Sequence, residues 1–588
     1  MNQEWSLDPL YKGYDDPDFI RDMDLVPAKI EEFRKVVASL GQGEVKEDLI
    51  ACLKAQEELE AFSYRLMLFL NLKQSVNSAD EHAASGMAKV GMRMSTLGKD
   101  FTVAEKWIAS IEDLQAVIDS DPFLKEYEYR LQRIKKDSAH LLGDDVEDVI
   151  SRLDLSAGRA WGDLQTYLTS SVEVDYNGET TTLSGIRNMA YEEDPAIRKA
   201  AYEAELACYP KIADSVAFAL NNIKSQVNTI TELRGFASPL DMTLDQAHMT
   251  RATLEAMLAS INKYLPKFHE YLKAKAKLLG HKNGLPWYDL FAPVGNSNRK
   301  FTTEEAKEYL LDHFRPFAAD LADMVEEAFD NAWIDFFPRK GKSGGAFCAG
   351  SPTSKRSWIL TNYDGTLGDV VTLAHELGHA YHNHCLEGNR PLNMDYSMPV
   401  AETASTFNEV VIMSAAIAEA EGDAKMALVE SQLQDATQII CDIYSRYLFE
   451  SAVFAERQES FLFAPRLKEL MMDAQKKAYG DGLDHECLHP YMWVCKGHYY
   501  SSGLSFYNFP YAFGGLFARG LYAKYLEEGE AFLPKYRALL KATPTSEVED
   551  VAGIAGIDLT QPEFWDKSLE MIARDIDLFI RLAEEKQQ

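Results

Sequence analysis

The stretch that decides the fold of this chain covers residues 366–382 and reads TLGDVVTLAHELGHAYH. Thr366, followed three residues later by Asp369, has the spacing of a capping box, in which each side chain satisfies a free backbone N–H group at a helix start. The runs VVTLA and LGHAY are too apolar for a helix that lies in water on all sides. The segment therefore predicts a helix that begins near Thr366 and is largely buried.

Two histidines on this helix are four residues apart. His375 and His379 therefore lie on one side of the helix, one turn apart, which is the arrangement that two imidazoles need to bind one zinc ion. Glu376 follows the first histidine directly, so its carboxylate can lie beside a metal-bound water without occupying the metal. This order predicts a catalytic zinc site with Glu376 as the general base.

A third ligand is expected downstream, because a catalytic zinc usually has three protein ligands and leaves one position to water. Residues 398–409, MPVAETASTFNE, supply two carboxylates. Pro399 suits the first turn of a helix, and Glu402 and Glu409, seven residues apart, share one face of it. We expect Glu402 to bind the metal and Glu409 to accept a proton from a ligand histidine. By chemistry alone the two glutamates are interchangeable.

The two segments together resemble peptidase family M3, which includes thimet oligopeptidase and the bacterial oligoendopeptidase F group. The family pattern HExGHxxH followed by ExxSxxxE matches HELGHAYH, from His375, and ETASTFNE, from Glu402. Pro399 and Ala404 stand where the thimet-like branch has Asp and Pro, which favours the oligoendopeptidase F branch. The likeness covers most of residues 195–575. It implies that Glu402 is the third zinc ligand.

Most of the chain has apolar residues at three- and four-residue spacing, which is typical of helices that pack on helices. The helical segments expected from this pattern are 45–75, 102–142, 193–233, 251–280, 303–332, 400–480 and 562–586. Residues 170–183 alternate around Asn177-Gly178 and predict a β-hairpin. We expect a mostly α fold with an N-terminal helical lobe, 1–190, and a metallopeptidase catalytic domain, 191–588. The resemblance implies a large two-lobed helical body with a deep substrate channel, and a small β-strand element beside the zinc helix.

A second hydrogen-bond donor beside the metal is usual in such sites, since the tetrahedral intermediate of peptide hydrolysis carries a negatively charged oxygen. Residues 498–515, HYYSSGLSFYNFPYAFGG, contain a histidine and several tyrosines, and tyrosine donates a hydrogen bond while it stays neutral. The resemblance points to His498, Tyr507 and Tyr511 as the catalytic donors. The alternative for each tyrosine is packing in the core.

Residues 357–362 follow a glycine-rich segment and predict a short strand that ends in a turn. In this family, as in other zinc peptidases, a strand edge beside the metal pairs with the substrate backbone, so Ser357, Trp358 and Ile359 are expected to contact the substrate. His382 lies one turn beyond the second ligand histidine. A fourth protein ligand would close the site to water, so we expect His382 to support the site or to contact the substrate.

The composition excludes several kinds of partner. The chain carries 60 basic and 92 acidic side chains, a formal net charge of −32, and has no basic cluster that could hold a nucleic acid. No segment approaches the roughly 20 apolar residues that cross a bilayer, and the acidic first residues lack the pattern of a secretory signal. The seven scattered cysteines indicate neither a disulfide framework nor a cysteine zinc site. We expect a cytoplasmic protein of open oligomeric state.

These residues and the resemblance together predict an endopeptidase with one Zn²⁺ per chain that hydrolyses internal bonds of short peptides. Glu376 takes the proton of the attacking water and passes it to the leaving amine. One alternative is a metallocarboxypeptidase or dipeptidase on a similar helical scaffold, which needs a cationic group for the free carboxylate of its substrate. The other is a non-catalytic peptide-binding protein with structural zinc, but a structural site has no use for the adjacent Glu376.

Overall fold

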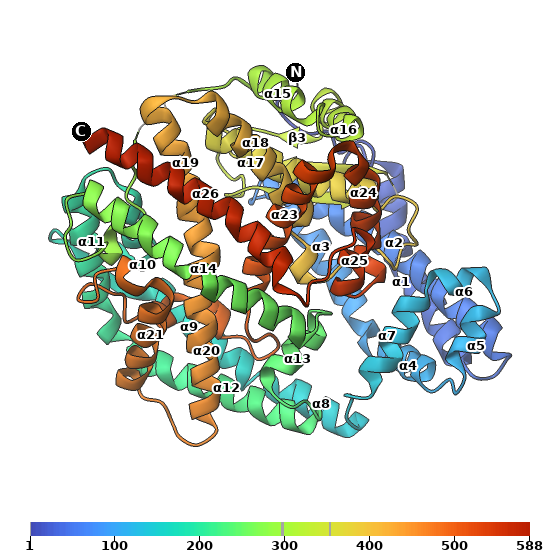
Figure 1. Ribbon diagram of the computed structural model, residues 1–588. Helices are drawn as coiled ribbons and strands as arrows, with labels where there is room; N and C mark the ends of the chain where they lie inside the picture. Colours follow the sequence, from blue (N-terminus) through green and yellow to red (C-terminus); the bar gives the residue numbers. More distant parts are fainter. Residues whose placement is uncertain (1, 296–298, 352–353, 588) are drawn as a thin grey trace.

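A computed structural model of the chain describes residues 2–295, 299–351 and 354–587, and helices dominate it (Figure 1). The mostly α fold expected from the periodicity is therefore confirmed. Three of the expected segments are single long helices, namely α2 (Val45–Val76), α14 (Arg251–Leu278) and α26 (Pro562–Gln587). Among the described residues, no helix has the length and apolarity that crossing a bilayer requires.

The N-terminal helices gather on one side of the molecule (Figure 1). They are α1 (Pro17–Ser39), α2, α3 (Glu81–Met94), α4 (Gly98–Ala109), α5 (Leu114–Asp119), α6 (Pro122–Glu126) and α7 (Glu128–Ser138). The helical pattern over 102–142 is thus interrupted, because Asp113 and Asp121 accept hydrogen bonds from backbone N–H groups and start new helices. These helices supply most of two apolar cores, one around Phe33 and Phe69, which also includes Trp358, and one around Tyr127, which also includes Leu392.

The middle of the chain adds a hairpin and a second group of helices. Their bounds are α8 (Asp144–Asp154), α9 (Gly158–Ser171), β1 (Glu173–Tyr176), β2 (Glu179–Thr182), α10 (Leu183–Asn188), α11 (Pro195–Cys208), α12 (Ala213–Leu233), α13 (Pro239–Gln246), α14, α15 (Thr303–Phe314) and α16 (Ala319–Asp330). Strands β1 and β2 pair antiparallel around Asn177 and Gly178, whose φ angles of 54° and 83° suit a tight hairpin turn. The expected hairpin is confirmed.

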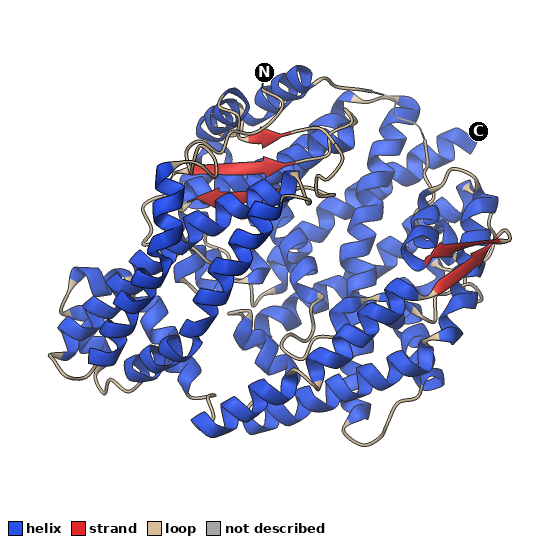
Figure 2. Ribbon diagram, turned by 180° about the vertical axis from the view of Figure 1, so that it is seen from behind, coloured by secondary structure: helices blue, strands red, loops and turns tan. Residues whose placement is uncertain are grey.

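A three-stranded sheet lies far from this hairpin (Figure 2). Its strands are β3 (Ile334–Asp335), β4 (Phe347–Ser351) and β5 (Arg356–Leu360), in the order β3-β5-β4, with β3 parallel and β4 antiparallel to β5. The expected strand near 357–362 is therefore present. It lies in the centre of the sheet, between the two edge strands β3 and β4, so the expectation that it offers a free edge is wrong. Trp358 and Ile359 are fully buried.

The C-terminal half is again mostly helical. Its helices are α17 (Leu367–Cys385), α18 (Thr403–Glu419), α19 (Gly422–Thr437), a π-helical turn (Gln438–Asp442), α20 (Ile443–Arg457), α21 (Ala464–Tyr479), α22 (Met492–Cys495), α23 (Phe509–Glu528), α24 (Leu533–Ala542), α25 (Val548–Ile554) and α26. Strands β4 and β5 pack on α17, which packs on α18. The two helices are very close at Gly378, where a Cβ atom would lie 2.5 Å from the carbonyl oxygen of Ala404.

Candidate active site

Helix α17 carries the first part of the site. The predicted capping box is present: Thr366 Oγ1 accepts a hydrogen bond from the N–H of Asp369 at 3.1 Å, and Asp369 Oδ2 accepts one from the N–H of Thr366 at 2.9 Å. Two turns further on, the rings of His375 and His379 lie side by side, with centroids 4.9 Å apart. Both imidazoles face the start of α18.

Glu402, directly before α18, completes the cluster. Its Oε2 atom lies 3.3 Å from Nε2 of His375 and 3.3 Å from Nε2 of His379. Ser405 Oγ donates a hydrogen bond to the same oxygen at 2.6 Å and so fixes the carboxylate. Ligand atoms about 2 Å from a tetrahedral zinc ion lie about 3.3 Å from one another. The two nitrogens and the oxygen therefore fit a zinc ion in their type and in their spacing.

Glu409 contacts the same site from behind. Its Oε1 atom accepts a hydrogen bond from Nδ1 of His375, which leaves Nε2 of that ring directed towards Glu402. This is the contact that the sequence predicts for a carboxylate that orients a ligand histidine. Asn408, one residue earlier, donates to the carbonyl oxygen of Ala374 at 3.2 Å and ties α18 to α17. The geometry thus separates the two glutamates that chemistry alone left interchangeable.

The electrostatics of the cluster favour a cation. Burial opposes a charge on His375, but the hydrogen bond to Glu409 and the nearby carboxylates raise its pKa to about 9. Burial also opposes the charge of Glu402, yet its contacts with His379 lower the pKa of Glu402 to about 2. Burial raises the pKa of Glu376, whose residue is only 5% exposed. The surroundings therefore hold two imidazoles in a field of negative charge.

The three predicted donors from the C-terminal segment lie together. The ring centroid of His498 is 4.5 Å from that of Tyr507 and 5.9 Å from that of Tyr511. Burial raises the pKa of Tyr511, with smaller contributions from Tyr507 and from the charge of Glu402, so the phenol stays protonated. Helix α23 approaches Glu402 closely, since a Cβ atom on Gly514 would lie 3.4 Å from Cβ of Glu402.

His382 is buried between α17 and the end of α24. It has no exposed surface, stacks on Tyr396 with ring centroids 4.2 Å apart, and its Nε2 atom is 2.9 Å from Thr543 Oγ1 beyond α24. Burial lowers its pKa to about 3, so the ring is neutral. The expectation that His382 contacts the substrate is therefore wrong, and the ring joins α17 to the end of α24 instead.

Two cavities are lined by residues predicted for the site. One, of about 440 Å³, is lined by His375, Glu376 and Glu409. The other, of about 470 Å³, is lined by His498 and Tyr511 and also by residues to which no role was assigned from the sequence, Arg446 and Lys496 among them. Sequence reasoning also assigned nothing to Ser405 and Asn408. The position of Ser405 within the ExxSxxxE pattern was the available signal for its contact with Glu402.

Known proteins resemble this chain over most of its length. The family model described as "Peptidase family M3" matches residues 188–571, and the model described as "Oligopeptidase F" matches residues 109–173. The oligopeptidase PepF of Bacillus subtilis is 26% identical over 482 residues, which cover 80% of this chain and 71% of that protein. An oligoendopeptidase F homolog of Borreliella burgdorferi is 25% identical over 583 residues, 95% of each chain.

A solved structure shares the fold. The crystal structure of oligoendopeptidase-F from Enterococcus faecium superimposes with a TM-score of 0.72 over 97% of this chain and 99% of that one, at 19% sequence identity. The region matched by the first family model contains His375, His379 and Glu402, the three residues that could hold a metal ion. On this evidence the chain belongs to peptidase family M3 and is a peptidase.

Proposed function

We propose that the protein is a zinc-dependent endopeptidase that hydrolyses internal bonds of short peptides. The observation that carries this proposal is the cluster of His375, His379 and Glu402, whose ligand atoms all lie within 4.8 Å of one another beside the buried Glu376. A site built only for structure would have no need of that fourth residue. The names of the relatives, oligopeptidase and oligoendopeptidase, support short peptides as substrates.

Nε2 of each histidine and Oε2 of Glu402 would hold the ion. When bound, zinc polarises the scissile carbonyl and lowers the pKa of a water molecule towards neutrality. Glu409 keeps the proton of His375 on Nδ1 and so keeps Nε2 free as a ligand. Ser405 binds the same oxygen of Glu402 and limits its rotation.

Glu376 would accept the proton of the attacking water and deliver it to the leaving amine. Burial raises its pKa, which brings the carboxylate closer to the value that suits a group that takes and returns a proton near neutral pH. His498, Tyr507 and Tyr511 would donate hydrogen bonds to the oxygen on which negative charge develops. Burial, and then the charges of Arg446 and Lys496, lower the pKa of His498, so it donates as a neutral ring.

The edge of β4 would hold the substrate backbone. Ile359 of β5 donates its N–H to the carbonyl oxygen of Trp333, beside β3, and not to β4. Cys348, which lies opposite Ile359 in β4, therefore directs its own N–H and C=O groups away from β5, to the free edge of β4. Gly350, two residues on, faces the same edge, and its carbonyl accepts a hydrogen bond from the Tyr64 hydroxyl at 2.8 Å. Main-chain pairing with β4 would give affinity without strict sequence preference.

This assignment changes the role of the residues expected to contact the substrate. Ser357, Trp358 and Ile359 belong to the central strand and would support β4 rather than pair with a peptide. Trp358 donates from Nε1 to the carbonyl oxygen of Ser6 at 2.8 Å, which ties the sheet to the N-terminal segment. We propose that the substrate channel runs along β4, past the metal cluster, between the two cavities that site residues line.

The test uses an internally quenched peptide with both ends blocked. The wild-type protein loaded with zinc should cleave it in the middle, and Glu376→Gln should keep its zinc while turnover falls by about 10²–10⁴-fold or more. Unchanged turnover in the variant would remove Glu376 from the reaction. Cleavage only of peptides with free ends would favour the metallocarboxypeptidase or dipeptidase instead.

We also propose that the enzyme works in the cytoplasm. All seven cysteines are free thiols, three of them buried, and thiols persist where glutathione and thioredoxin keep them reduced. Fractionation of producing cells should find the protein with cytoplasmic markers. Recovery in the secreted fraction would contradict this.

A further inference from the structure

The cavity of about 470 Å³ next to His498 and Tyr511 contains charged groups that the proposed reaction does not use. It lies between the π-helical turn at the start of α20 and the segment after α22, and Asp442, Arg446 and Lys496 line it. Because two proposed catalytic donors form part of its wall, whatever binds there lies close to the scissile bond. π-helical turns frequently occur at functional sites.

The charges that face this cavity do not cancel. Arg446 pairs with Asp442 through Nη2 and Oδ2 at 2.5 Å, and both side chains are largely buried. In the part of the chain that the structure describes, no carboxylate forms an ion pair with Lys496. Nε of Arg446 and Nδ1 of His498 are buried with no hydrogen-bond partner among the described residues. The wall thus carries two cations, Arg446 and Lys496, against one carboxylate, Asp442, and this excess of positive charge suits an anion.

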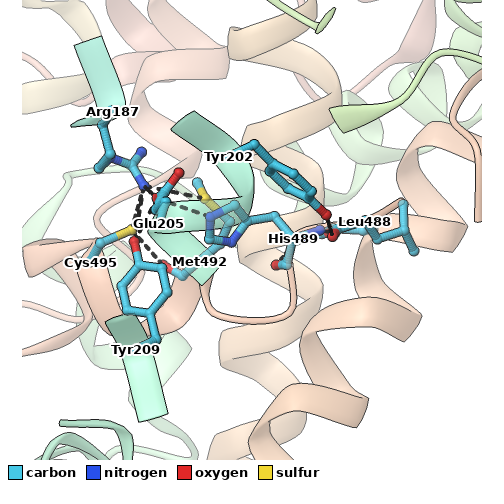
Figure 3. A network of polar contacts seen from close by, with 9 residues as sticks. Arg187, Tyr202, Glu205, Tyr209, Leu488, His489, Met492 and Cys495 are labelled. Carbon is cyan, nitrogen blue, oxygen red and sulfur yellow. Dashed lines mark hydrogen bonds and ion pairs between the residues drawn. The ribbon is translucent and has the colours of Figure 1, made fainter. Parts of the chain in front are cut away.

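A buried network fixes the segment that carries Lys496 (Figure 3). Glu205 accepts a hydrogen bond from Arg187 at 2.6 Å and is 3.0 Å from Nε2 of His489. Arg187 also contacts Sγ of Cys495, the residue before Lys496, at 2.9 Å. Glu205 is therefore occupied and does not neutralise the lysine. Burial lowers the pKa of Lys496, and an anionic ligand beside the ammonium group would offset that cost.

We propose that this cavity binds a carboxylate of the peptide substrate, with Lys496 as its main cationic partner, and that this carboxylate is the C-terminal one. The inference rests on the proposed function and deepens it. Every linear peptide has a C-terminal carboxylate, whereas recognition of the backbone by β4 provides no preference for an acidic side chain. A cation at a fixed place beside the catalytic donors would fix the distance from the cleaved bond to the end of the peptide.

The first experiment compares one peptide with a free C-terminal acid and the same peptide with a C-terminal amide. Wild-type kcat/KM should be on the order of tenfold higher for the acid, the size of a lost hydrogen bond to a charged group. Lys496→Met should cleave both forms alike, and Lys496→Arg should restore part of the preference. The matched control is Lys273→Met, because Lys273 is an exposed lysine that pairs with Asp481 at the surface. This control should keep the full preference.

The second experiment maps cleavage positions by mass spectrometry in alanine-rich peptides lengthened one residue at a time at the C-terminus. In the wild type the cleaved bond should move with the C-terminus, and in Lys496→Met it should not. Equal rates for acid and amide in the wild type, or a preference that survives in Lys496→Met, would overturn the proposal. A preference that follows an interior Glu over Gln would keep the carboxylate site and assign it to an acidic side chain.

Calorimetry separates this inference from the proposed function. The inactive variant Glu376→Gln should bind the acid peptide on the order of tenfold more tightly than the amide, whether or not the wild type cleaves either one. If the wild type cleaves neither peptide but this difference in Kd remains, the proposed function fails and the carboxylate site stands. If the two Kd values are equal, the carboxylate site fails.

Discussion

Gly378 gives the sharpest test of how α17 and α18, which position the three proposed zinc ligands, are held together. A methyl group at this position would lie 2.5 Å from the carbonyl oxygen of Ala404 and 2.5 Å from Cα of Ser405. Both are backbone atoms and cannot rotate away. In Gly378→Ala, α17 and α18 must therefore separate by about 0.5 Å before the contact reaches 3.0 Å, the shortest that real Cβ atoms show.

This separation acts on stability and on the metal site. Overpacking of this kind destabilises a protein by about 1–3 kcal/mol. Alanine in place of glycine stabilises the helix by about 1 kcal/mol through its higher helix propensity. The net loss in the free energy of unfolding is therefore about 2 kcal/mol at most. The larger effect is on Glu402, three residues before Ser405, which moves away from both histidines. A misplacement of about 1 Å can cost about 10²-fold in rate, so half that distance should lower kcat/KM by roughly tenfold.

The assay measures kcat/KM with an internally quenched peptide, and the dissociation constant of zinc by competition with a chromophoric chelator. The matched control is Gly368→Ala on the same helix, where the nearest atom to the added methyl group would be Thr366 Oγ1 at 3.5 Å, an ordinary contact. Zinc affinity and kcat/KM of Gly378→Ala within twofold of the control would refute the reasoning that the close approach at Gly378 sets the position of Glu402.

A chelator should abolish peptide hydrolysis, and added zinc should restore it. Metal analysis should find that Glu402→Ala has lost the ion and that Glu409→Ala retains part of it. Retention in Glu402→Ala and loss in Glu409→Ala would exchange the roles of the two glutamates. Burial alone would raise the pKa of Glu205, but its hydrogen-bond and charged partners lower this pKa from 4.5 to about 2. The ionised carboxylate therefore stabilises the folded protein by about 3 kcal/mol. This stabilisation is complete above pH 4.5 and is lost as the pH falls towards 2. The free energies of unfolding of wild type and Glu205→Gln, measured in urea, should therefore differ by that amount at pH 7 and by less at pH 3. An equal difference at both pH values would contradict this role of Glu205. Glu450 forms a buried ion pair with Lys224 at 2.7 Å, both side chains being 1% exposed, so Glu450→Gln should lose about 3–5 kcal/mol in the same measurement, and wild-type stability would count against the pair.

Local patterns predicted well those parts of the fold that depend on neighbours in sequence. The capping box at Thr366 and the hairpin around Asn177 each need only three or four consecutive residues, and both are present. The order of the strands in the sheet depends instead on pairing between segments that are distant in the sequence. Ile334 pairs with Ile359, 25 positions away, and no periodicity records that pairing.

The site residues also divide into those placed by a single helix and those placed by contacts between distant elements. The spacing of His375 and His379 was sufficient to place both imidazoles together, because a helix fixes that geometry by itself. The spacing of His382 was equally regular, but α24 covers that ring, and its contact with Thr543 spans 161 residues. Lys496 and Arg446 also meet only in the folded chain. A helical pattern predicts which residues share a face, and it cannot predict which distant element covers that face.

The length of β4 has a consequence for the behaviour of the protein in a crowded solution. An open strand border invites pairing with any extended chain, including partly unfolded neighbours, and so favours aggregation. Here the strand has five residues, and the Tyr64 hydroxyl already occupies one of its outward carbonyls. A foreign chain would gain few backbone bonds there, too few to hold without help from the metal centre. If β4 pairs with peptides as proposed, the brevity of this border would limit unwanted pairing with other chains.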